Sequence, residues 1–238
     1  MKTSNKILLI TIFFVLFITL ITVISITIFL FSENPHLIKY GKGSNEKISK
    51  EYDLHNFNLI DFEGFWKANI IYDRLYKIKL TAPEYLMEYI EIDVFEQKLK
   101  LKQSYFTGIP PISIEVSISI PVLKEIISNV STDIYFTNFD EEKIIIKTSG
   151  YSKIKGNNSY IKHLQITGSG IIENDFYLCK VVNSELNLSG SGTTKLNMYG
   201  GILNGQVNGN IIVTYKGSIS EQNIYASESV KIQKENEN

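Results

Sequence analysis

The sequence predicts an all-β protein, a β-solenoid with an N-terminal β portion, preceded by one transmembrane helix. From residue 52 onward, short runs of β-branched and aromatic residues alternate with Gly, Asn, Ser and Asp, and no helical period of useful length occurs. Small polar motifs recur at nearly even intervals in the second half of the chain. An uncharged apolar run lies close to the N-terminus.

The apolar run extends from Ile7 to Phe31 and contains no charged residue. At a rise of about 1.5 Å per residue, a helix of this length crosses the roughly 30 Å hydrocarbon core of a bilayer. The alternative is a cleaved signal peptide, whose apolar core is shorter, about 7–15 residues, and ends at a small-residue cleavage site. The segment Ser32–Pro35 contains no such site. We therefore expect an uncleaved signal-anchor that contacts the lipid bilayer.

The lysines around this run predict its orientation. Lys2 and Lys6 precede it with the α-amino group, whereas Lys39 and Lys42 follow it together with Glu33. The positive-inside rule then favours a single-pass protein with its C-terminal domain outside the cytoplasm, in the periplasm or at the cell surface. The expected organisation is a cytoplasmic N-terminus at 1–6, an anchor at 7–31, a polar tether at 32–51, an N-terminal β portion at 52–125, β-solenoid repeats at 126–233 and a polar tail at 234–238.

The N-terminal β portion contains several runs with the alternation of strands that have one solvated face. The stretch Pro83–Tyr89 is compatible with either a helical turn or a loop. The predicted strands are Phe57–Phe62, Ala68–Tyr72, Tyr76–Thr81, Ile90–Phe95, Lys98–Gln103 and Ser113–Ile120.

A degenerate repeat follows Pro121. Its marks are the segments 128–131, 149–152, 167–170, 189–192, 207–210 and 226–229, whose second residues are spaced by 21, 18, 22, 18 and 19. A period of about 20 residues, with a strand, a Gly/Ser corner and another strand, is typical of one solenoid coil. The alternative is a β-sandwich whose turns happen to contain Gly-Ser. The residues expected to form the corners, where a positive φ is often needed, are Gly150, Gly168, Gly170, Gly190, Gly192, Asn208 and Gly209.

The ordered set of motifs resembles a bacterial family, the auto-transporter adhesin head GIN domain, a domain of unknown function. The lead-in Ile118–Ile126 is similar to that family, as are the corners Thr167–Gly170 and Ser189–Gly192 and the step Tyr215–Gly217. The resemblance covers about residues 52–233. It implies a single-stranded right-handed β-helix and an envelope or surface location.

Composition and spacing argue against several function classes. The formal net charge is −1 and Arg74 is the only arginine, so a nucleic-acid partner is not expected. Cys179 is the only cysteine and lies in an apolar run, so we expect a small buried side chain, no cysteine-based metal site and no cofactor. The aspartates of the repeat region, Asp133, Asp140 and Asp175, share no offset from their corners. The chain is therefore not expected to be an enzyme.

The remaining hypotheses concern binding. Tyrosines are frequent in and near the repeats, and exposed aromatic rings stack on sugars or anchor protein partners. We predict Tyr151 and Tyr199 as ligand-binding residues, although tyrosines can also cap the interior of a solenoid. The first hypothesis is an envelope module that binds a surface glycan or another polymer. The second is a scaffold that contacts an envelope protein, and the third is a carbohydrate-active enzyme.

Overall fold

The computed structural model describes residues 17–25, 46–104 and 112–235. Residues 17–25 are helical, and the rest of the predicted anchor at 7–31 lies outside the described residues. No helix within the described ranges has the length and apolar character needed to span a bilayer. Residues 46–104 and 112–235 belong to one compact unit, which contains the β structure.

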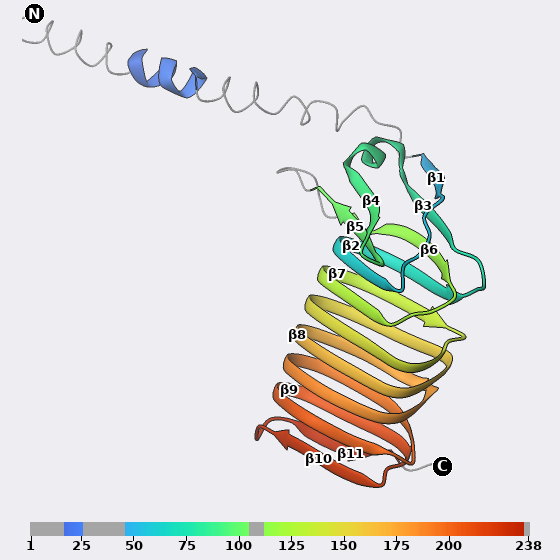
Figure 1. Ribbon diagram of the computed structural model, residues 1–238. Coiled ribbons are helices and arrows are strands. Elements are labelled where there is room, and N and C mark those ends of the chain that lie inside the picture. The colour runs from blue at the N-terminus through green and yellow to red at the C-terminus, as the bar shows by residue number, and fades with distance from the viewer. Residues whose placement is uncertain (1–16, 26–45, 105–111, 236–238) are drawn as a thin grey trace, which may run out of the picture. The chain divides into compact units, whose positions relative to one another are not determined.

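The described strands form one mixed sheet (Figure 1). The strands are β1 (Lys47–Tyr52), β2 (Leu59–Tyr72), β3 (Lys77–Pro83), β4 (Ile90–Phe95), β5 (Lys98–Gln103), β6 (Ile114–Ile120), β7 (Glu125–Thr137), β8 (Asp140–Tyr199), β9 (Ile202–Ser218), β10 (Glu221–Ala226) and β11 (Lys231–Lys234). The predicted all-β class is confirmed.

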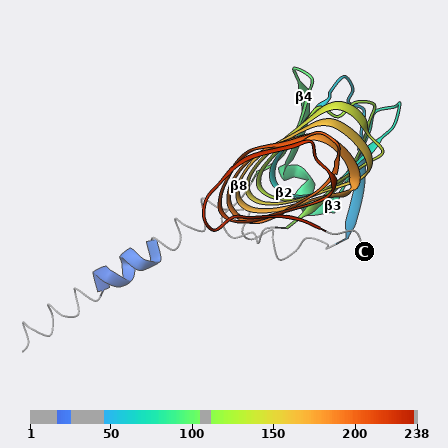
Figure 2. The same cartoon turned by 90° about the horizontal axis from the view of Figure 1, so that it is seen from below.

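The second half of the chain is extended backbone that folds over itself in successive turns of similar length. β8 alone is 60 residues long. β7 pairs in parallel with β8 from Glu125↔Ile145 to Thr137↔Asn157, and β8 pairs in parallel with β9 from Ser184↔Leu203 to Tyr199↔Ser218. Figures 1 and 2 show these segments as stacked turns with a flattened outline. The parallel pairing repeats at the interval that the spacing of the polar motifs predicts.

β2 pairs with β7 in the same manner, although β3 to β6 lie between them in the sequence. The register runs from Leu59↔Glu125 to Ile71↔Thr137. The first half of β2 also pairs with β5, and its second half pairs with β6. Two predicted strands, Phe57–Phe62 and Ala68–Tyr72, therefore belong to one strand that bends from one side of the stack to the other.

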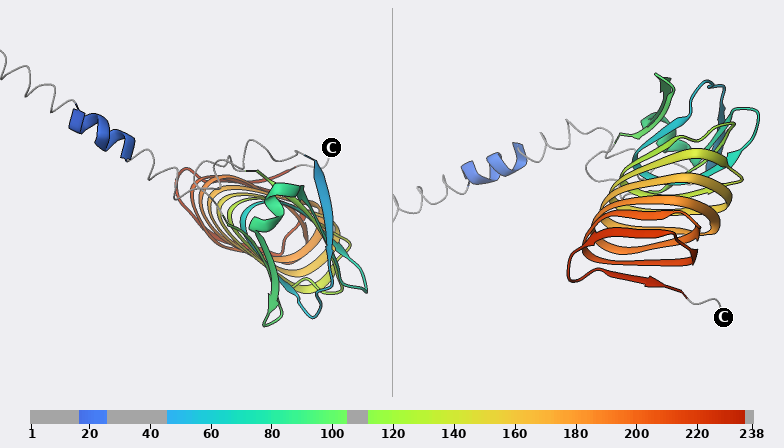
Figure 3. Two further views of the ribbon diagram at one scale, coloured as in Figure 1. Left: turned by 90° about the horizontal axis from the view of Figure 1, so that it is seen from above. Right: turned by 60° about the horizontal axis from the view of Figure 1, so that its bottom comes forward.

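Antiparallel strands and a short helix lie at the N-terminal end of the stack. β4 pairs with β5, β3 pairs with β6, and β1 pairs with β3. The stretch at Pro83–Tyr89 is a 3₁₀ helix, η1 (Glu84–Tyr89), which lies across this end and buries Leu86 (Figure 3). Residues 47–52 form β1, although the tether was predicted to extend to residue 51. β1 is a mostly exposed edge strand, so its side chains lack the apolar alternation that indicates a buried strand in a sequence.

One corner repeats a left-handed backbone conformation from turn to turn. The register places Gly64 beside Val130, Val130 beside Gly150 and Gly190 beside Gly209. We call this set the corner column; its members and their φ angles are Gly64 (124°), Val130 (93°), Gly150 (88°), Gly170 (97°), Gly190 (123°) and Gly209 (97°). Successive turns touch through backbone here, since a Cβ on Gly170 would lie 2.3 Å from the Gly150 carbonyl oxygen.

The predicted corner residues divide into two groups. Gly150, Gly170, Gly190, Gly192 and Gly209 have positive φ. Gly168 and Asn208, which the sequence analysis also places at corners, do not.

Gly168 lies instead on an inward-facing position. A Cβ there would lie 2.9 Å from Thr148 Oγ1 and 3.3 Å from Leu188 Cδ2. Glycine is needed here because the interior has no space for a side chain, and not because the backbone turns. The Gly-Ser motif alone does not distinguish these two reasons.

The interior is mainly apolar and continuous through the described turns. Phe136 and Phe176 are two turns apart, yet their ring centroids are 6.0 Å from each other. The contact is possible because Gly156 lies between them, and a Cβ at that position would come within 2.7 Å of Phe136 and 3.0 Å of Phe176. Cys179 is buried, as expected, and a Gly156 Cβ would also lie 2.6 Å from its Sγ.

Polar side chains connect the turns as the repeat predicts. Ser149 Oγ donates to Asn129 Oδ1 at 2.9 Å, and Asn158 Nδ2 donates to Asn138 Oδ1 at 2.7 Å. Inside the stack, Asn174 Nδ2 donates to Thr194 Oγ1 at 3.3 Å. Each bond joins two positions that are one turn apart in the sequence, so these side chains support the same register as the backbone.

Replacing Gly190 by Val is predicted to destabilise the protein strongly. A Cβ at this position would lie 2.1 Å from the Gly170 carbonyl oxygen, in addition to the strain of a β-branched residue at positive φ. The expected loss exceeds about 3 kcal/mol, measured by thermal or chemical unfolding. The control is Gly200→Val, because Gly200 has a φ of 90° but no atom within 4 Å of the position that a Cβ would take. Equal losses in the two variants would show that contact between turns at the corner is unimportant.

Replacing Val130 by Gly is predicted to stabilise the protein. Val130 is the one β-branched member of the corner column, and 46% of its surface is exposed, so little apolar burial is lost. The substitution relieves about 1–3 kcal/mol of backbone strain, and the extra entropy of glycine in the unfolded chain offsets part of this. The free energy of unfolding should therefore rise by about 1 kcal/mol. The expected rise in Tm is about 2–4 °C. Val182→Gly, at a position without positive φ, should lower Tm, and a lower Tm for Val130→Gly would contradict the strain argument.

Candidate binding surface

The turns present two long outward faces on opposite sides of the corner column. The polar face consists of the outward side chains of 125–129, 145–149, 165–169, 185–189, 204–208 and 223–227. The lysine face consists of those of 131–137, 151–157, 171–177, 191–199 and 210–218. On both faces inward and outward positions alternate, so each turn contributes three outward side chains to the polar face and four or five to the lysine face.

The polar face is nearly uncharged in its C-terminal turns. From residue 165 onward, Glu185 is the one charged side chain among the described segments of this face. The remaining outward residues are mainly amides and hydroxyls, among them Gln165, Thr167, Asn187 and Asn204. This face therefore offers hydrogen-bonding groups but little charge.

The lysine face carries charges of both signs, and an ion pair joins two neighbouring turns in its first half. Lys153 Nζ lies 3.1 Å from Glu173 Oε2, one turn further along the chain. Pairing with Glu173 is also the main cause of a raised pKa at Lys153. Both side chains are partly exposed, so the pair adds little stability.

Three depressions lie along the lysine face or at its edge. The first has a volume of about 600 Å³ and is lined by residues of β6, β2 and β7, with Lys153 and Lys155 at one end. The second, of about 190 Å³, continues from the same two lysines to Glu173, Thr193 and Lys195. The third, here called the C-terminal depression, has a volume of about 580 Å³. Its lining residues are Lys180, Asn197, Met198, Tyr199, Gly217, Ser218, Lys234 and Glu235.

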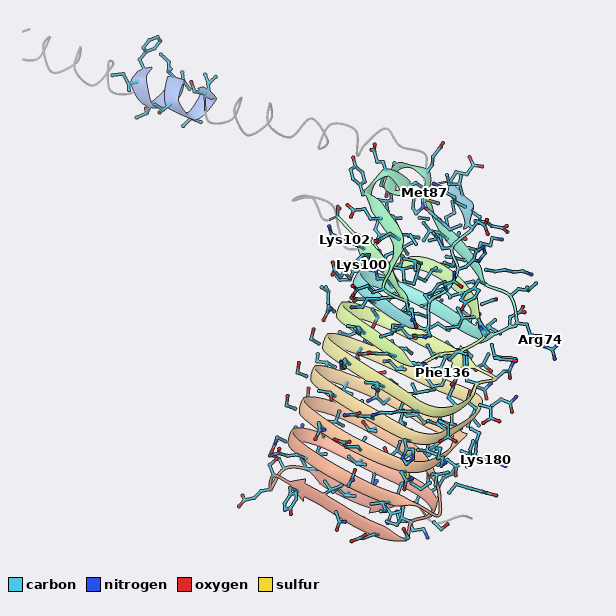
Figure 4. All side chains as sticks on the ribbon, in the orientation of Figure 1. Arg74, Met87, Lys100, Lys102, Phe136 and Lys180 are labelled. Carbon is cyan, nitrogen blue, oxygen red and sulfur yellow. The ribbon has the colours of Figure 1, made fainter. Side chains whose placement is uncertain are left out.

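Tyr199, one of the two predicted ligand-binding tyrosines, lines the C-terminal depression, and 58% of its surface is exposed. Lys180 Nζ lies 5.3 Å from the centroid of its ring. Figure 4 shows Lys180 projecting outward from the turns, whereas Phe136 lies among them. An exposed ring beside cations can stack on a flat partner.

Tyr151, the other predicted tyrosine, lies next to the corner column at the opposite edge of the lysine face. It is 38% exposed, and its hydroxyl donates to Glu173 Oε1 at 3.4 Å. The structure therefore does not bring Tyr151 and Tyr199 together in one depression. Tyr215, by contrast, is an interior residue, in agreement with the expectation that some tyrosines cap the core.

A second tyrosine near the C-terminal depression, Tyr177, was not predicted to bind. Its ring centroid lies 5.5 Å from Lys195 Nζ and 5.2 Å from Lys216 Nζ. Burial, together with a hydrogen bond to Glu235, raises the pKa of its hydroxyl. The signal in the sequence is the recurrence of Lys195, Lys216 and Lys234 at intervals close to one turn.

The side chains that could serve as a nucleophile or as acid–base groups are buried or dispersed. Burial raises the pKa of the Cys179 thiol to about 12, so it remains protonated at neutral pH. Asp133 lies beside Lys153 in the register, whereas Asp175 lines the second depression, so the two aspartates come from different turns. Among residues 17–25, 46–104 and 112–235, no group of three or more His, Cys, Asp or Glu side chains is arranged to hold a metal ion.

Comparison with known proteins identifies the family. The model of the family described as "Putative auto-transporter adhesin, head GIN domain" matches residues 56–236. The chain belongs to this family. The resemblance inferred from the sequence motifs is thus confirmed, and its extent agrees within a few residues. No curated protein matches the chain.

Two solved structures share the fold of this head GIN domain. A crystal structure of a putative adhesin from Bacteroides fragilis has a TM-score of 0.57 and 17% identity, covering 81% of this chain and 98% of that one. A crystal structure of a putative lipid binding protein from Parabacteroides distasonis has a TM-score of 0.53 and 16% identity, covering 82% and 98%. At these identities the likeness concerns the fold alone.

Proposed function

We propose that this chain is a membrane-anchored, non-catalytic module of the bacterial envelope or cell surface that binds polysaccharide or another extended surface polymer. Its head GIN domain is proposed to be a single-stranded right-handed β-helix. The anchor is the apolar segment 7–31, and the residues that follow it lie outside the cytoplasm, in the periplasm or at the cell surface. Membership of an adhesin family supports this location.

The observation that carries the proposal is the succession of depressions along the lysine face. The first two share Lys153 and Lys155, and the third begins just beyond Lys195, at Asn197. At about 4.8 Å between neighbouring strands, the face extends for roughly 34 Å from β6 to β11. A long, shallow surface of this kind suits an extended chain that makes many weak contacts, and not a small substrate held in an enclosed pocket.

The scaffold hypothesis remains the second candidate, supported by the last strands. β10 and β11 both pair with β9, and no other described strand pairs with either of them. An exposed strand edge of this kind can accept a strand from a protein partner. A carbohydrate-active enzyme is the third and weakest candidate, because the acidic residues of the turns are dispersed and Cys179 is buried.

Replacing Tyr199 by Ala is predicted to weaken the retention of the protein on cell-wall or capsular glycans by about fivefold, because the exposed ring supplies stacking area. The measurement is affinity electrophoresis of the full-length chain in non-ionic detergent. Tyr199→Phe should retain binding. The control is Tyr225→Ala, since Tyr225 is 80% exposed but lies in β10 on the polar face. Tyr151→Ala, tested alone and with Tyr199→Ala, shows whether the polymer also reaches the opposite edge.

Two results would contradict the proposed function. Release of shortened oligosaccharides by the purified protein would show that it is an enzyme. Equal retention of the wild type and Tyr199→Ala on every glycan, or no retention at all, would favour the scaffold hypothesis.

A further inference from the structure

Three lysines of the earlier turns have carboxylate partners, which the lysines of the last turns lack among the described residues. In the earlier turns Lys147, Lys153 and Lys162 pair with carboxylates at 2.8–3.1 Å. In the last turns no described carboxylate lies within ion-pair distance of the lysines that surround the C-terminal depression and the Tyr177 ring. These are Lys180, Lys195, Lys216 and Lys234.

The nearest carboxylates have other partners. Glu235 lines the C-terminal depression and accepts the hydrogen bond of the Tyr177 hydroxyl. Asp175 Oδ1 accepts the Tyr177 backbone N–H at 3.2 Å. Among the described residues, the lining of the depression carries Lys180, Lys234 and Glu235, a formal charge of +1, and Lys195 and Lys216 lie nearby beside the Tyr177 ring. The C-terminal depression is therefore a local positive region with exposed aromatic surface.

The lysines are also spread over successive turns, although they do not share one column, since Lys195 pairs with Thr214 and Lys234 pairs with Tyr215. Asn197 pairs with Lys216 and Tyr215 pairs with Lys234, so Lys195, Lys216 and Lys234 belong to three successive turns. Successive turns are about 4.8 Å apart. A linear polymer lying along the stack meets one of these cations at each turn, whereas a single small anion would meet only one or two.

We propose that the C-terminal depression binds an acidic polysaccharide. The lysine ammonium groups pair with carboxylate or phosphate groups of the polymer, and a sugar ring stacks on Tyr199. This inference rests on the proposed function and specifies the ligand class. Lysine is a compact point charge that binds carboxylates and phosphates alike, so the site selects for negative charge and not for the geometry of one anion.

A membrane surface is the less suitable partner. Insertion into a bilayer needs a contiguous apolar surface beside the cations. Between Tyr177 and Lys180 the one exposed apolar side chain is Leu178, and the rest of the lining is polar or charged apart from Met198, which is buried.

The test measures binding of the full-length chain, in non-ionic detergent, to immobilised polygalacturonate, phosphomannan and dextran. We expect binding to one or both acidic polysaccharides, weakening as salt is raised, and much weaker binding to neutral dextran. Polygalacturonate and phosphomannan distinguish carboxylate from phosphate as the preferred group. The double variant Lys180→Gln/Lys234→Gln should bind the acidic polymer about tenfold more weakly.

The matched control is Lys77→Gln/Lys79→Gln, which removes the same charge from two exposed lysines of β3, at the other end of the stack. It should bind within about twofold of the wild type, since screening limits the effect of distant charges. Both double variants should keep the wild-type Tm, because none of the four lysines has an ion pair among the described residues.

The outcomes separate this inference from the proposed function. If dextran binds as tightly as the acidic polymers, or if Lys180→Gln/Lys234→Gln binds like the wild type, the inference is overturned and polymer binding stands. If no polymer binds, this inference is overturned, and retention on cell-wall or capsular glycans decides the proposed function. If phosphatidylglycerol vesicles bind through the same lysines and no polysaccharide does, the site is a membrane-binding surface and the inference is wrong.

Discussion

The stack depends on a backbone conformation that recurs at one corner from turn to turn. Each turn places a residue with positive φ beside the corresponding residue of its neighbour, from Gly64 to Gly209. At Gly170, Gly190 and Gly209, a side chain would overlap the carbonyl oxygen of the preceding turn. The corner column therefore sets both how sharply each turn bends and how closely the turns approach. A slip of one residue would place a side chain in that contact, so the corner also fixes the register.

Once the register is fixed, the position of every side chain follows from the alternation of extended backbone. Most inward positions are apolar, and Gly156 gives the space in which Phe136 and Phe176 meet across two turns. Outward positions form columns of residues that are one turn apart. These columns produce the ion pairs of the middle turns, such as Lys162 with Glu142 at 3.0 Å. They also produce the row of lysines beside Tyr177 that pair with no described carboxylate, so the candidate site is a consequence of the stacking.

The sequence predicts the part of this structure that is local or periodic. The strands Ile90–Phe95 and Lys98–Gln103 have the predicted bounds, because alternation and flanking turn residues define them within a few positions. The spacing of the polar motifs predicts the parallel pairing of β7, β8 and β9, since all turns there have nearly equal length.

Other features depend on partners that are distant in the sequence. β2 joins the stack through β7, but four other strands lie between them in the chain, so the short period of the motifs does not reveal this pairing. Val130 belongs to the corner column, but the sequence does not reveal this, because a β-branched residue does not indicate positive φ. The lysines of the C-terminal depression come from β8 and β11, and only the folded structure shows that they line the same depression.

The most direct test of this account is a distance between two members of one outward column. Asn129 lies beside Ser149, and Ser189 lies beside Asn208, so four strand spacings of about 4.8 Å separate Asn129 from Asn208. Spin labels at these two positions, in a Cys179→Ala background, can be measured by double electron–electron resonance. The stacked turns predict a narrow distribution centred at about 20 Å. A broad distribution, or one centred beyond about 30 Å, would show that the turns do not stack in this register.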